Sequence, residues 1–329
     1  MFVLGKWVEH GWKVSLAVVL YLIAAVAAVA QSDANVVHVL PHSDRVSYQP
    51  RESTFRSNVD LVLVNVTVLD RSNRTVTGLA SDDFSLLEDK RPQTIKYFSS
   101  DDQPLSLAIV LDASASMASK MEQARRTVLE LAGTANPSDD VSLVVVGDKP
   151  SVELSFDDNG EILPKRLAAI QPRGRTALWD AMFLALDQMK YAHYQRRAMV
   201  VISDGGDNHS VYNESELKSR LEEADVQLYA VGLFDRFPQR NEERRGPRDL
   251  DELTSTTGGR LMPVVDSDEM KHAVTQINEE LRNEYVIGYL PSDRASNAKW
   301  RTIKVAVREA AKHRKLRLYA KKGYYSAGD

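Results

Sequence analysis

Five oxygen-bearing side chains, spread over three stretches of the sequence, have the chemistry to bind a divalent cation. They are Asp112, Ser114, Ser116, Thr176 and Asp204. The first three alternate within one turn, so they converge on a single point if the turn curls around it. Oxygens that carry little total charge suit Mg2+, which takes six oxygens at about 2.0–2.1 Å and keeps some waters. Mn2+ and Ca2+ are the alternative ions, whereas Zn2+ would prefer His or Cys.

Buried strands are expected immediately before two of these groups. The apolar run 107–111 ends at Asp112, and the run 198–203 ends at Asp204. Short runs rich in branched residues are typical of strands that are buried on both faces. In an open parallel sheet the carboxyl ends of the strands line one edge, and ligands bind there, so one site can collect all five side chains. Asp and Ser are also common in turns and caps, so the DxSxS pattern alone fits a turn without a metal equally well.

Helices are expected to follow the first two stretches. Ser119 and Glu122 form a candidate capping box, and apolar residues keep helical spacing from Met121 onward. Thr176 stands just before a second segment with helical spacing, which begins near Leu178. Its hydroxyl is therefore expected at a loop or at the start of a helix.

The pattern of DxSxS, a distant Thr and a strand-ending Asp before Gly resembles the metal-ion-dependent adhesion site of von Willebrand factor type A (VWFA) domains. The resemblance covers roughly 105–282 and continues in 250–262, LDELTSTTGGRLM, which looks like the Thr-Gly-Gly segment common in bacterial members. The flanking stretches LASDDFSLLEDKRPQTIKYF and EYVIGYLP are similar to those of a bacterial group of VWFA-related proteins common in acidobacteria.

The resemblance implies a fold, a metal and a partner. The fold would be α/β, with a doubly wound and mostly parallel sheet and a small β domain built from segments before and after it. Ser114, Ser116 and Thr176 would contact Mg2+ more directly, while Asp112 and Asp204 would act mostly through water. An Asp or Glu carboxylate from a partner protein would then fill the open position on the metal.

Composition narrows the function further. The chain has 329 residues, and its hydrophobic fraction of 43% permits a sizeable core. Acidic residues outnumber basic ones by 46 to 42, which argues against a general nucleic-acid binder. Cysteine is absent, which excludes disulfides, thiolate metal sites and cysteine catalysis. The basic run from Lys312 to Lys322 partly alternates with apolar residues, as expected for a strand with one solvated face.

The N-terminus has the layout of a secretory signal peptide. Lys6 and Lys13 precede an uncharged run over 14–30 that ends in Ala-Val-Ala. Cleavage there would make the protein secreted or periplasmic. The alternative is an uncleaved membrane anchor, because the run approaches the roughly 20 residues that span a bilayer. The expected layout is a signal peptide over 1–30, a linker over 31–58, the small β domain over 59–103 and 284–326, and the VWFA domain over 104–283.

Short strands are predicted on both sides of the α/β domain. They cover 60–69, 84–88 and 94–98 before it, and 284–290, 301–307 and 315–319 after it. Each set is too small to bury a good core alone, so the two sets are expected to pair with each other. Inside the α/β domain we expect a hairpin of 141–146 and 152–156, helices at 162–170, 214–224 and 267–282, and strands at 226–233 and 260–265. A further short helix is expected to end at Gly258-Gly259.

A charged stretch over 234–251 is predicted to be a loop at the same sheet edge as Asp112 and Asp204. It contributes five candidate partner-binding residues, Arg236, Arg240, Arg244, Arg245 and Arg248. Loops on a rigid scaffold often set specificity, so these arginines would favour an acidic partner. The alternative is a solvated connector.

Two other functions compete with metal-dependent binding. The first is a metal-independent structural module of the cell envelope. The second is a serine hydrolase in which His209 activates Ser114 or Ser116. The chain has no GxSxG elbow, and the serines have a better use as metal ligands. The prediction is therefore a non-enzymatic binding protein.

Overall fold

The computed structural model describes residues 61–329, with gaps at 236–237, 239, 294–298, 309–315 and 327–329. The predicted signal peptide and linker lie outside these described residues, as do Arg236 and part of the basic run near the C-terminus. Within the described ranges, no helix combines the length and the apolar character that a membrane span requires.

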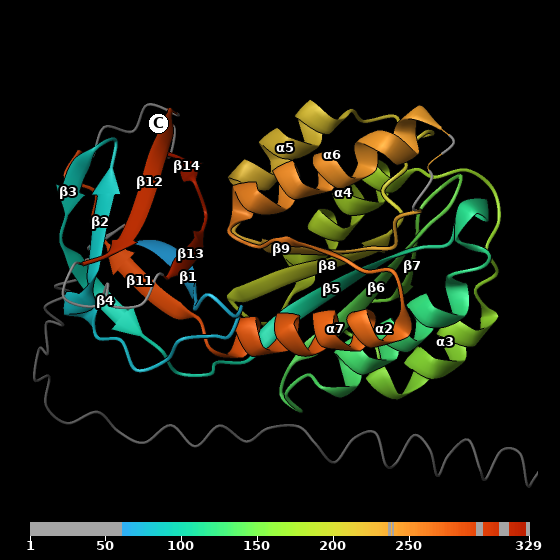
Figure 1. Cartoon of the computed structure of the whole chain (residues 1–329), viewed down its shortest axis with the longest axis horizontal. Coiled ribbons are helices and arrows are strands. Elements are labelled where there is room, and N and C mark those ends of the chain that lie inside the picture. Colours follow the sequence, from blue (N-terminus) through green and yellow to red (C-terminus); the bar gives the residue numbers. More distant parts are fainter. Residues whose placement is uncertain (1–60, 236–237, 239, 294–298, 309–315, 327–329) are drawn as a thin grey trace, which may run out of the picture. The chain divides into compact units, whose positions relative to one another are not determined.

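A six-stranded sheet forms the centre of the α/β part (Figure 1). Its strands, in spatial order, are β10 (Leu261–Pro263), β9 (Gln227–Gly232), β8 (Arg196–Ser203), β5 (Leu105–Asp112), β6 (Asp140–Val146) and β7 (Ser151–Leu154). All neighbouring pairs are parallel except β6 and β7, which form an antiparallel hairpin at the edge. The predicted hairpin and edge strand are therefore confirmed.

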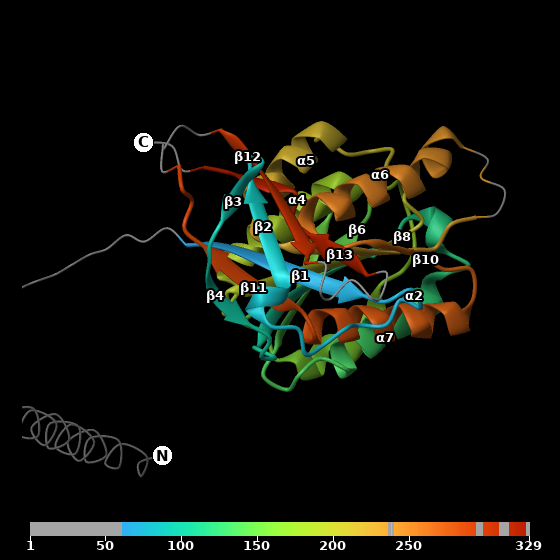
Figure 2. The ribbon, with the colours of Figure 1, turned by 60° about the vertical axis from the view of Figure 1, so that its left-hand side comes forward.

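Helices cover both faces of this sheet (Figure 2). On one face lie α2 (Met121–Gly133), α3 (Leu163–Ala169) and α7 (Ser267–Arg282), and on the other lie α4 (Leu178–Gln188), α5 (Glu214–Glu223) and α6 (Asn241–Thr257). Every residue of β5 is buried. Its alternate side chains enter opposite cores, Ile109 facing the first set of helices and Val110 the second. This is the reason for the unbroken apolar run in the sequence.

Two antiparallel four-stranded sheets form the remaining part. The first has the order β13 (Arg317–Ala320), β1 (Val62–Leu69), β11 (Tyr285–Tyr289), β4 (Ile95–Ser99), and the second has the order β14 (Gly323–Tyr325), β12 (Trp300–Val307), β2 (Phe84–Glu88), β3 (Arg91–Gln93). Short 3-10 helices cover Ser81–Asp83, Ala115–Met117, Gly160–Ile162 and Met189–Tyr191.

The strands from before the α/β part pair directly with those from after it. In β1, Val66 stands opposite Tyr285 of β11, and in β2, Leu86 stands opposite Val305 of β12. Both sheets share one hydrophobic core. The predicted fold class is therefore confirmed, including the small β domain built from two segments. The residue limits proposed for each domain stay predictions, and strands β3 and β14 were not anticipated.

Two local predictions are wrong. Helix α2 begins at Met121 with Lys120 as its N-cap and no side-chain cap bond, so Ser119 and Glu122 form no capping box. The charged stretch 234–251 is not a loop throughout, because α6 begins at Asn241 and includes Pro247. Glycine, proline and many charges favoured a loop, but the buried face of α6, which includes Leu250 and Leu253, outweighs that preference.

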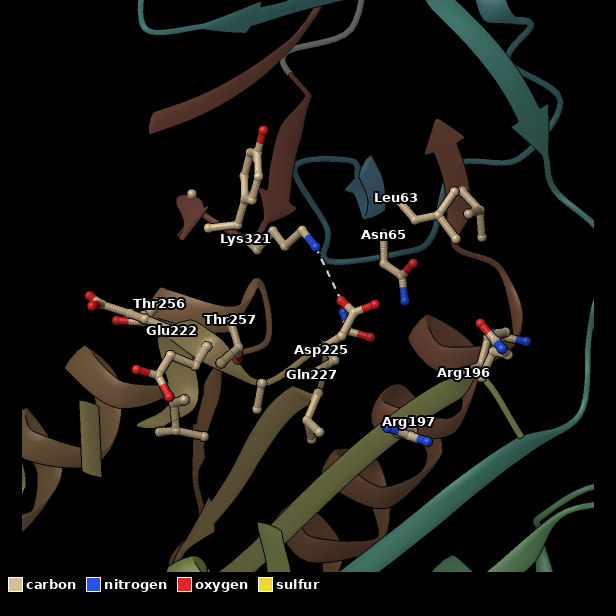
Figure 3. Close-up of a pocket in the computed structure, with 18 residues that line it drawn as sticks. Leu63, Asn65, Arg196, Arg197, Glu222, Asp225, Gln227, Thr256, Thr257 and Lys321 are labelled. Carbon is tan, nitrogen blue, oxygen red and sulfur yellow. Dashed lines mark hydrogen bonds and ion pairs between the residues drawn. The ribbon is translucent and has the colours of Figure 1, made fainter. Parts of the chain in front are cut away.

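A small pocket of about 120 Å³ lies where the antiparallel sheets meet the amino ends of β8 and β9 (Figure 3). The β-sheet part contributes Asn65 and Lys321, and Lys321 pairs with Asp225 at 3.1 Å. Beside this pocket, Glu284 is buried, and its Oε1 accepts hydrogen bonds from Asn65 at 3.1 Å and from Arg196 at 3.0 Å. One carboxylate thus joins β1, β8 and the start of β11.

Burial raises the pKa of Glu284 to about 7, although the positive charge of Arg196 acts in the opposite direction. The second oxygen, Oε2, has no hydrogen-bond partner among the described residues. The carboxyl group therefore binds a proton more tightly in the folded chain than in the unfolded chain.

We expect Glu284→Gln to change the pH dependence of stability. From about pH 4.5, the ordinary pKa, up to about 7, the unfolded chain loses this proton while the folded chain keeps it, so the wild type loses stability as pH rises. The free energy of unfolding of the variant relative to wild type should rise across that window, on the order of 2–3 kcal/mol. Guanidinium unfolding at several pH values measures this difference. The exposed Glu122→Gln is the control, and a pH-independent difference for Glu284→Gln would contradict the expectation.

Candidate functional site

The turn after β5 holds the first three predicted ligands close together. Asp112 is fully buried at the end of the strand, and its Oδ1 accepts the backbone N–H of Ser114 at 2.9 Å. The 3-10 helix Ala115–Met117 then curls the chain, so that the hydroxyls of Ser114 and Ser116 lie 3.0 Å apart. The curled turn that the alternating spacing requires is therefore present.

Backbone hydrogen bonds hold the loop before Thr176 against this turn. The N–H of Arg173 donates to the carbonyl of Ala113 at 2.9 Å, and the N–H of Ala115 donates to the carbonyl of Gly174 at 3.1 Å. Gly174 has a φ of 74°, a value that favours glycine. Thr176 itself is buried, two residues beyond this anchor.

The loop after β8 connects the third stretch to the other two. The Ser203 hydroxyl donates to Oδ2 of Asp112 at 2.6 Å, and Asn208 Oδ1 accepts the N–H of Thr176 at 3.1 Å. Asp204 is buried beside Asp112. The structure thus brings the turn after β5, the Thr176 loop and the end of β8 to one edge of the sheet, as predicted.

Two buried carboxylates dominate the electrostatics of this edge. Burial, followed by the negative charge of Asp204, raises the pKa of Asp112 to about 6. Ser203 and the N–H of Ser114 counteract this by donating hydrogen bonds to Asp112. Asp204 Oδ2 is buried with no hydrogen-bond partner among the described residues. A positive charge at this point would relieve the repulsion and supply the missing partner.

Lys120 already brings one positive charge to the site. Its Nζ lies 3.8 Å from Asp204 Oδ2 and 3.1 Å from Asp235 Oδ2. The ammonium is buried, and neither ion pair has hydrogen-bond geometry. Lys120 therefore offsets part of the charge of Asp204 without satisfying its oxygen. Nothing in the DxSxS pattern points to Lys120, so it was not among the predicted site residues.

The donor set fits Mg2+. Adjacent ligands of an octahedral ion at about 2.05 Å lie about 2.9 Å apart, close to the 3.0 Å between the Ser114 and Ser116 hydroxyls. The unpartnered oxygen of Asp204 supplies a further acceptor. No cluster of three or more His, Cys, Asp or Glu suited to a metal occurs in the described part of the chain.

Three residues at and after the end of β8 support the site without having been predicted as ligands. Ser203 orients Asp112, and Asn208 orients the Thr176 backbone. Asp207 Oδ1 accepts the N–H groups of Leu178 and Trp179 at 2.8 and 3.3 Å. Asp207 therefore caps the start of α4. Its position directly after Gly205 and Gly206 was the only signal in the sequence.

His209 does not contact the serines in the manner of a catalytic base. It is exposed, and its Nδ1 lies 3.3 Å from Arg175 Nη1. The Ser114 and Ser116 hydroxyls instead face each other. A nucleophile needs a base within hydrogen-bond reach, so this geometry gives the hydrolase alternative no support.

Helix α6 begins close to the loop after Asp204. A Cβ atom on Gly246 would lie 2.5 Å from the carbonyl oxygen of Gly205, so the two backbones are in direct contact. Gly205 has a φ of 80°, which also favours glycine. This close approach explains why a buried glycine stands inside a helix at Gly246.

Four of the five predicted partner-binding arginines lie on α6 or at its N-cap, whereas Arg236 is outside the described residues. Arg240, Arg244, Arg245 and Arg248 are exposed. However, the α6 residues next to Gly206 are Glu242 and Glu243, whose Cγ atoms lie 3.6 and 3.8 Å from the point that a Cβ on Gly206 would occupy. The α6 side chains closest to Gly206, in the loop after Asp204 (the metal-site loop), are therefore acidic and not the predicted arginines.

We expect Gly246→Ala to weaken Mg2+ binding, because the new methyl group displaces Gly205 and with it Asp204. Alanine normally favours a helix over glycine, but overpacking here should cost about 1–3 kcal/mol of stability. Calorimetric titration with Mg2+ and thermal unfolding measure both effects. Gly133→Ala in α2 is the matched control, because its Cβ would meet nothing within 4 Å. An unchanged Mg2+ affinity in Gly246→Ala would contradict the proposed coupling.

We expect the ion pairs of Lys120 to oppose metal binding. Lys120→Met removes the competing charge near Asp204, so Mg2+ should bind several-fold more tightly, while the metal-free protein should lose stability. Asp235→Asn should have the opposite effect on affinity, because Lys120 then interacts with Asp204 alone. Calorimetry on protein stripped with chelator measures both variants. If the Mg2+ affinities of Lys120→Met and Asp235→Asn both rose or both fell, competition between Lys120 and the metal would be excluded.

Residues 107–206 match the family model described as von Willebrand factor type A domain. Similar solved structures include an aerotolerance-related membrane protein from Bacteroides fragilis, with 22% identity, a TM-score of 0.44, and coverage of 54% of this chain and 98% of that one. BatB from Bacteroides thetaiotaomicron has 20% identity, a TM-score of 0.43 and the same coverages. A von Willebrand factor type A structure from Catenulispora acidiphila has 11% identity, a TM-score of 0.47, and coverages of 84% and 76%.

None of the curated proteins matches the chain. The family assignment therefore rests on the sequence match, which begins within β5 and ends two residues after Asp204. The narrower resemblance to an acidobacterial group stays a prediction. The matched segment and the doubly wound sheet agree, so this part of the chain has a von Willebrand factor type A domain.

Proposed function

We propose that the chain is an exported, non-enzymatic binding module that captures an Asp or Glu carboxylate of a partner protein through Mg2+. The observation that carries this proposal is the pair of hydroxyls 3.0 Å apart beside two buried carboxylates. VWFA domains are protein-interaction modules, which agrees with a binding role. Export rests on the N-terminal sequence pattern, and an uncleaved membrane anchor is the alternative.

Each residue of the site has a distinct role in this proposal. Mg2+, or Mn2+ or Ca2+ in its place, would supply an open coordination position for the partner's carboxylate. Ser114, Ser116 and Thr176 would hold the ion through their hydroxyls. Asp112 and Asp204 would act mostly through water and balance its charge. The Ser203 hydroxyl and the N–H of Ser114 keep the Asp112 carboxylate fixed.

The arginines of α6 would act at longer range. Arg244 and Arg245 are exposed, and Glu242 and Glu243 lie nearer to the metal-site loop. Charges at the rim of an interface mainly change the association rate and its salt dependence. We therefore assign Arg240, Arg244, Arg245 and Arg248 to the steering of an acidic partner, and the same role is proposed for Arg236.

A metal-independent scaffold is the second candidate function. The observation in its favour is Lys120, which already offsets the charge of Asp204 from 3.8 Å. A scaffold would hold its partner equally well in Mg2+ and in EDTA, whereas metal-dependent capture would require the cation. Capture of the same envelope protein under both conditions would therefore favour the scaffold.

Mg2+ titration tests the metal site directly. We expect wild-type protein stripped with chelator to bind one Mg2+ ion, and Asp112→Ala to bind it at least about tenfold more weakly, because one of the two carboxylates that balance the ion is lost. Asp82→Ala, which removes an exposed carboxylate on the β-sheet part, should bind as wild type does. Equal and negligible binding by wild type and Asp112→Ala would exclude the site.

A further inference from the structure

A groove of about 600 Å³ adjoins the metal site on its other side, away from α6. It lies between the β6–β7 hairpin, α3 and the segment that leads to Arg173. Its lining includes Ala113, the residue between Asp112 and Ser114. The groove therefore begins one residue away from the predicted metal ligands, and its volume falls in the range of roughly 300–1,000 Å³ that is usual for ligand pockets.

The acidic side chains in this groove already accept hydrogen bonds from residues of the chain. Asp148 Oδ1 accepts the backbone N–H of Arg175 at 2.8 Å, and this contact supports the loop that carries Thr176. Glu153 Oε1 accepts the hydroxyl of Ser151 at 2.8 Å. These carboxylates have internal structural partners, so they do not depend on a cationic ligand.

The basic side chains in the groove are free to bind. Lys149, Arg166 and Arg173 line it and are exposed, and their side chains have no hydrogen bond or ion pair with a described residue. Arg166 acts only weakly on Asp158, whose carboxylate already accepts two hydrogen bonds from Ser155. The unused hydrogen-bonding capacity of the groove therefore consists of positively charged donors, which favours an anionic ligand.

We propose that the groove binds a second acidic residue or short acidic segment of the same partner chain whose carboxylate fills the metal position. This inference rests on the proposed function. A peptide advances about 3.3 Å per residue when extended, so an acidic group a few residues from the metal-binding carboxylate reaches the groove. The α6 side is less suited to this direct contact, because Glu242 and Glu243 lie next to Gly206 there.

Synthetic peptides can test this assignment. The probes are a capped, labelled Gly-Ser peptide with a single Asp, and versions with two Glu placed about four residues before or after that Asp. Fluorescence anisotropy in Mg2+ should show that one of the Glu-containing versions binds wild type roughly tenfold more tightly than the single-Asp peptide, because charge-assisted contacts are added. The groove variant, Lys149→Gln with Arg166→Gln and Arg173→Gln, should lower this advantage to about twofold or less.

A matched control separates local contact from net charge. Arg71→Gln, Lys96→Gln and Lys304→Gln remove the same number of exposed positive charges from the β-sheet part, and this variant should keep the advantage. The inference is overturned if the groove variant keeps the advantage, or if both variants lose it equally. Thermal unfolding establishes that each variant is folded.

Two further comparisons separate this inference from the proposed function and from binding of another class of anion. The first compares peptide binding in Mg2+ and in EDTA, and the second compares the peptide with inorganic polyphosphate. If the preferred peptide binds equally in Mg2+ and EDTA but is lost in the groove variant, the groove assignment stands and metal-dependent capture falls. If inorganic polyphosphate of equal charge binds the groove more tightly than the peptide, the assignment to an acidic protein segment is overturned. Arg244→Ala with Arg245→Ala should slow peptide association while leaving the preference for the Glu-containing peptide intact.

Discussion

Parallel pairing of β5 with its neighbours forces two carboxylates into one buried corner. Leu111 of β5 stands opposite Ile202 of β8, so both strands end at the same level of the sheet and deliver Asp112 and Asp204 side by side. Like charges without water repel strongly. The rest of the site offsets this repulsion. Ser203 donates a hydrogen bond to Asp112, glycines allow the backbones to approach closely, and Lys120 brings a positive charge.

In the proposed site, two cations compete for Asp204: the ammonium group of Lys120 and the divalent metal ion. Without a metal, the ammonium between Asp204 and Asp235 is the available counter-charge, but it leaves Asp204 Oδ2 without a hydrogen bond. A divalent ion would satisfy that oxygen and carries twice the charge. The more exposed Asp235, whose Oδ2 lies 3.1 Å from Lys120 Nζ, would remain as the partner of Lys120 once the ion has bound Asp204. In the proposed site, the affinity for the metal would therefore depend on the difference between these two ion pairs of Lys120 as well as on the ligands themselves.

The sequence determined most of the fold because its signals were strong and local. The unbroken apolar run of β5 and the periodic spacing behind Met121 predicted a buried strand and a helix. Alternation in the terminal segments predicted strands that must find partners. The first part of α6 was missed because Pro247 and its neighbouring charges favour a loop locally. The buried face with Leu250 and Leu253 and the packing of Gly246 on Gly205 explain why that part is helical. Lys120 was missed because the distance that matters joins residues far apart in sequence.

The two ends of the central sheet differ in how far their polar side chains are paired within the chain. At the amino ends of β8 and β9, Glu284 and the Lys321–Asp225 pair connect the antiparallel sheets, and the small pocket there is crossed by these internal contacts. At the carboxyl ends, hydrogen-bonding capacity is left unused at Asp204 and along Lys149, Arg166 and Arg173. Unsatisfied polar groups are stabilised by whatever supplies the complementary charge. In the proposed function, a divalent cation would bind at Asp204 and leave a position open for one carboxylate. A second carboxylate of the same acidic partner chain would then bind Lys149, Arg166 and Arg173.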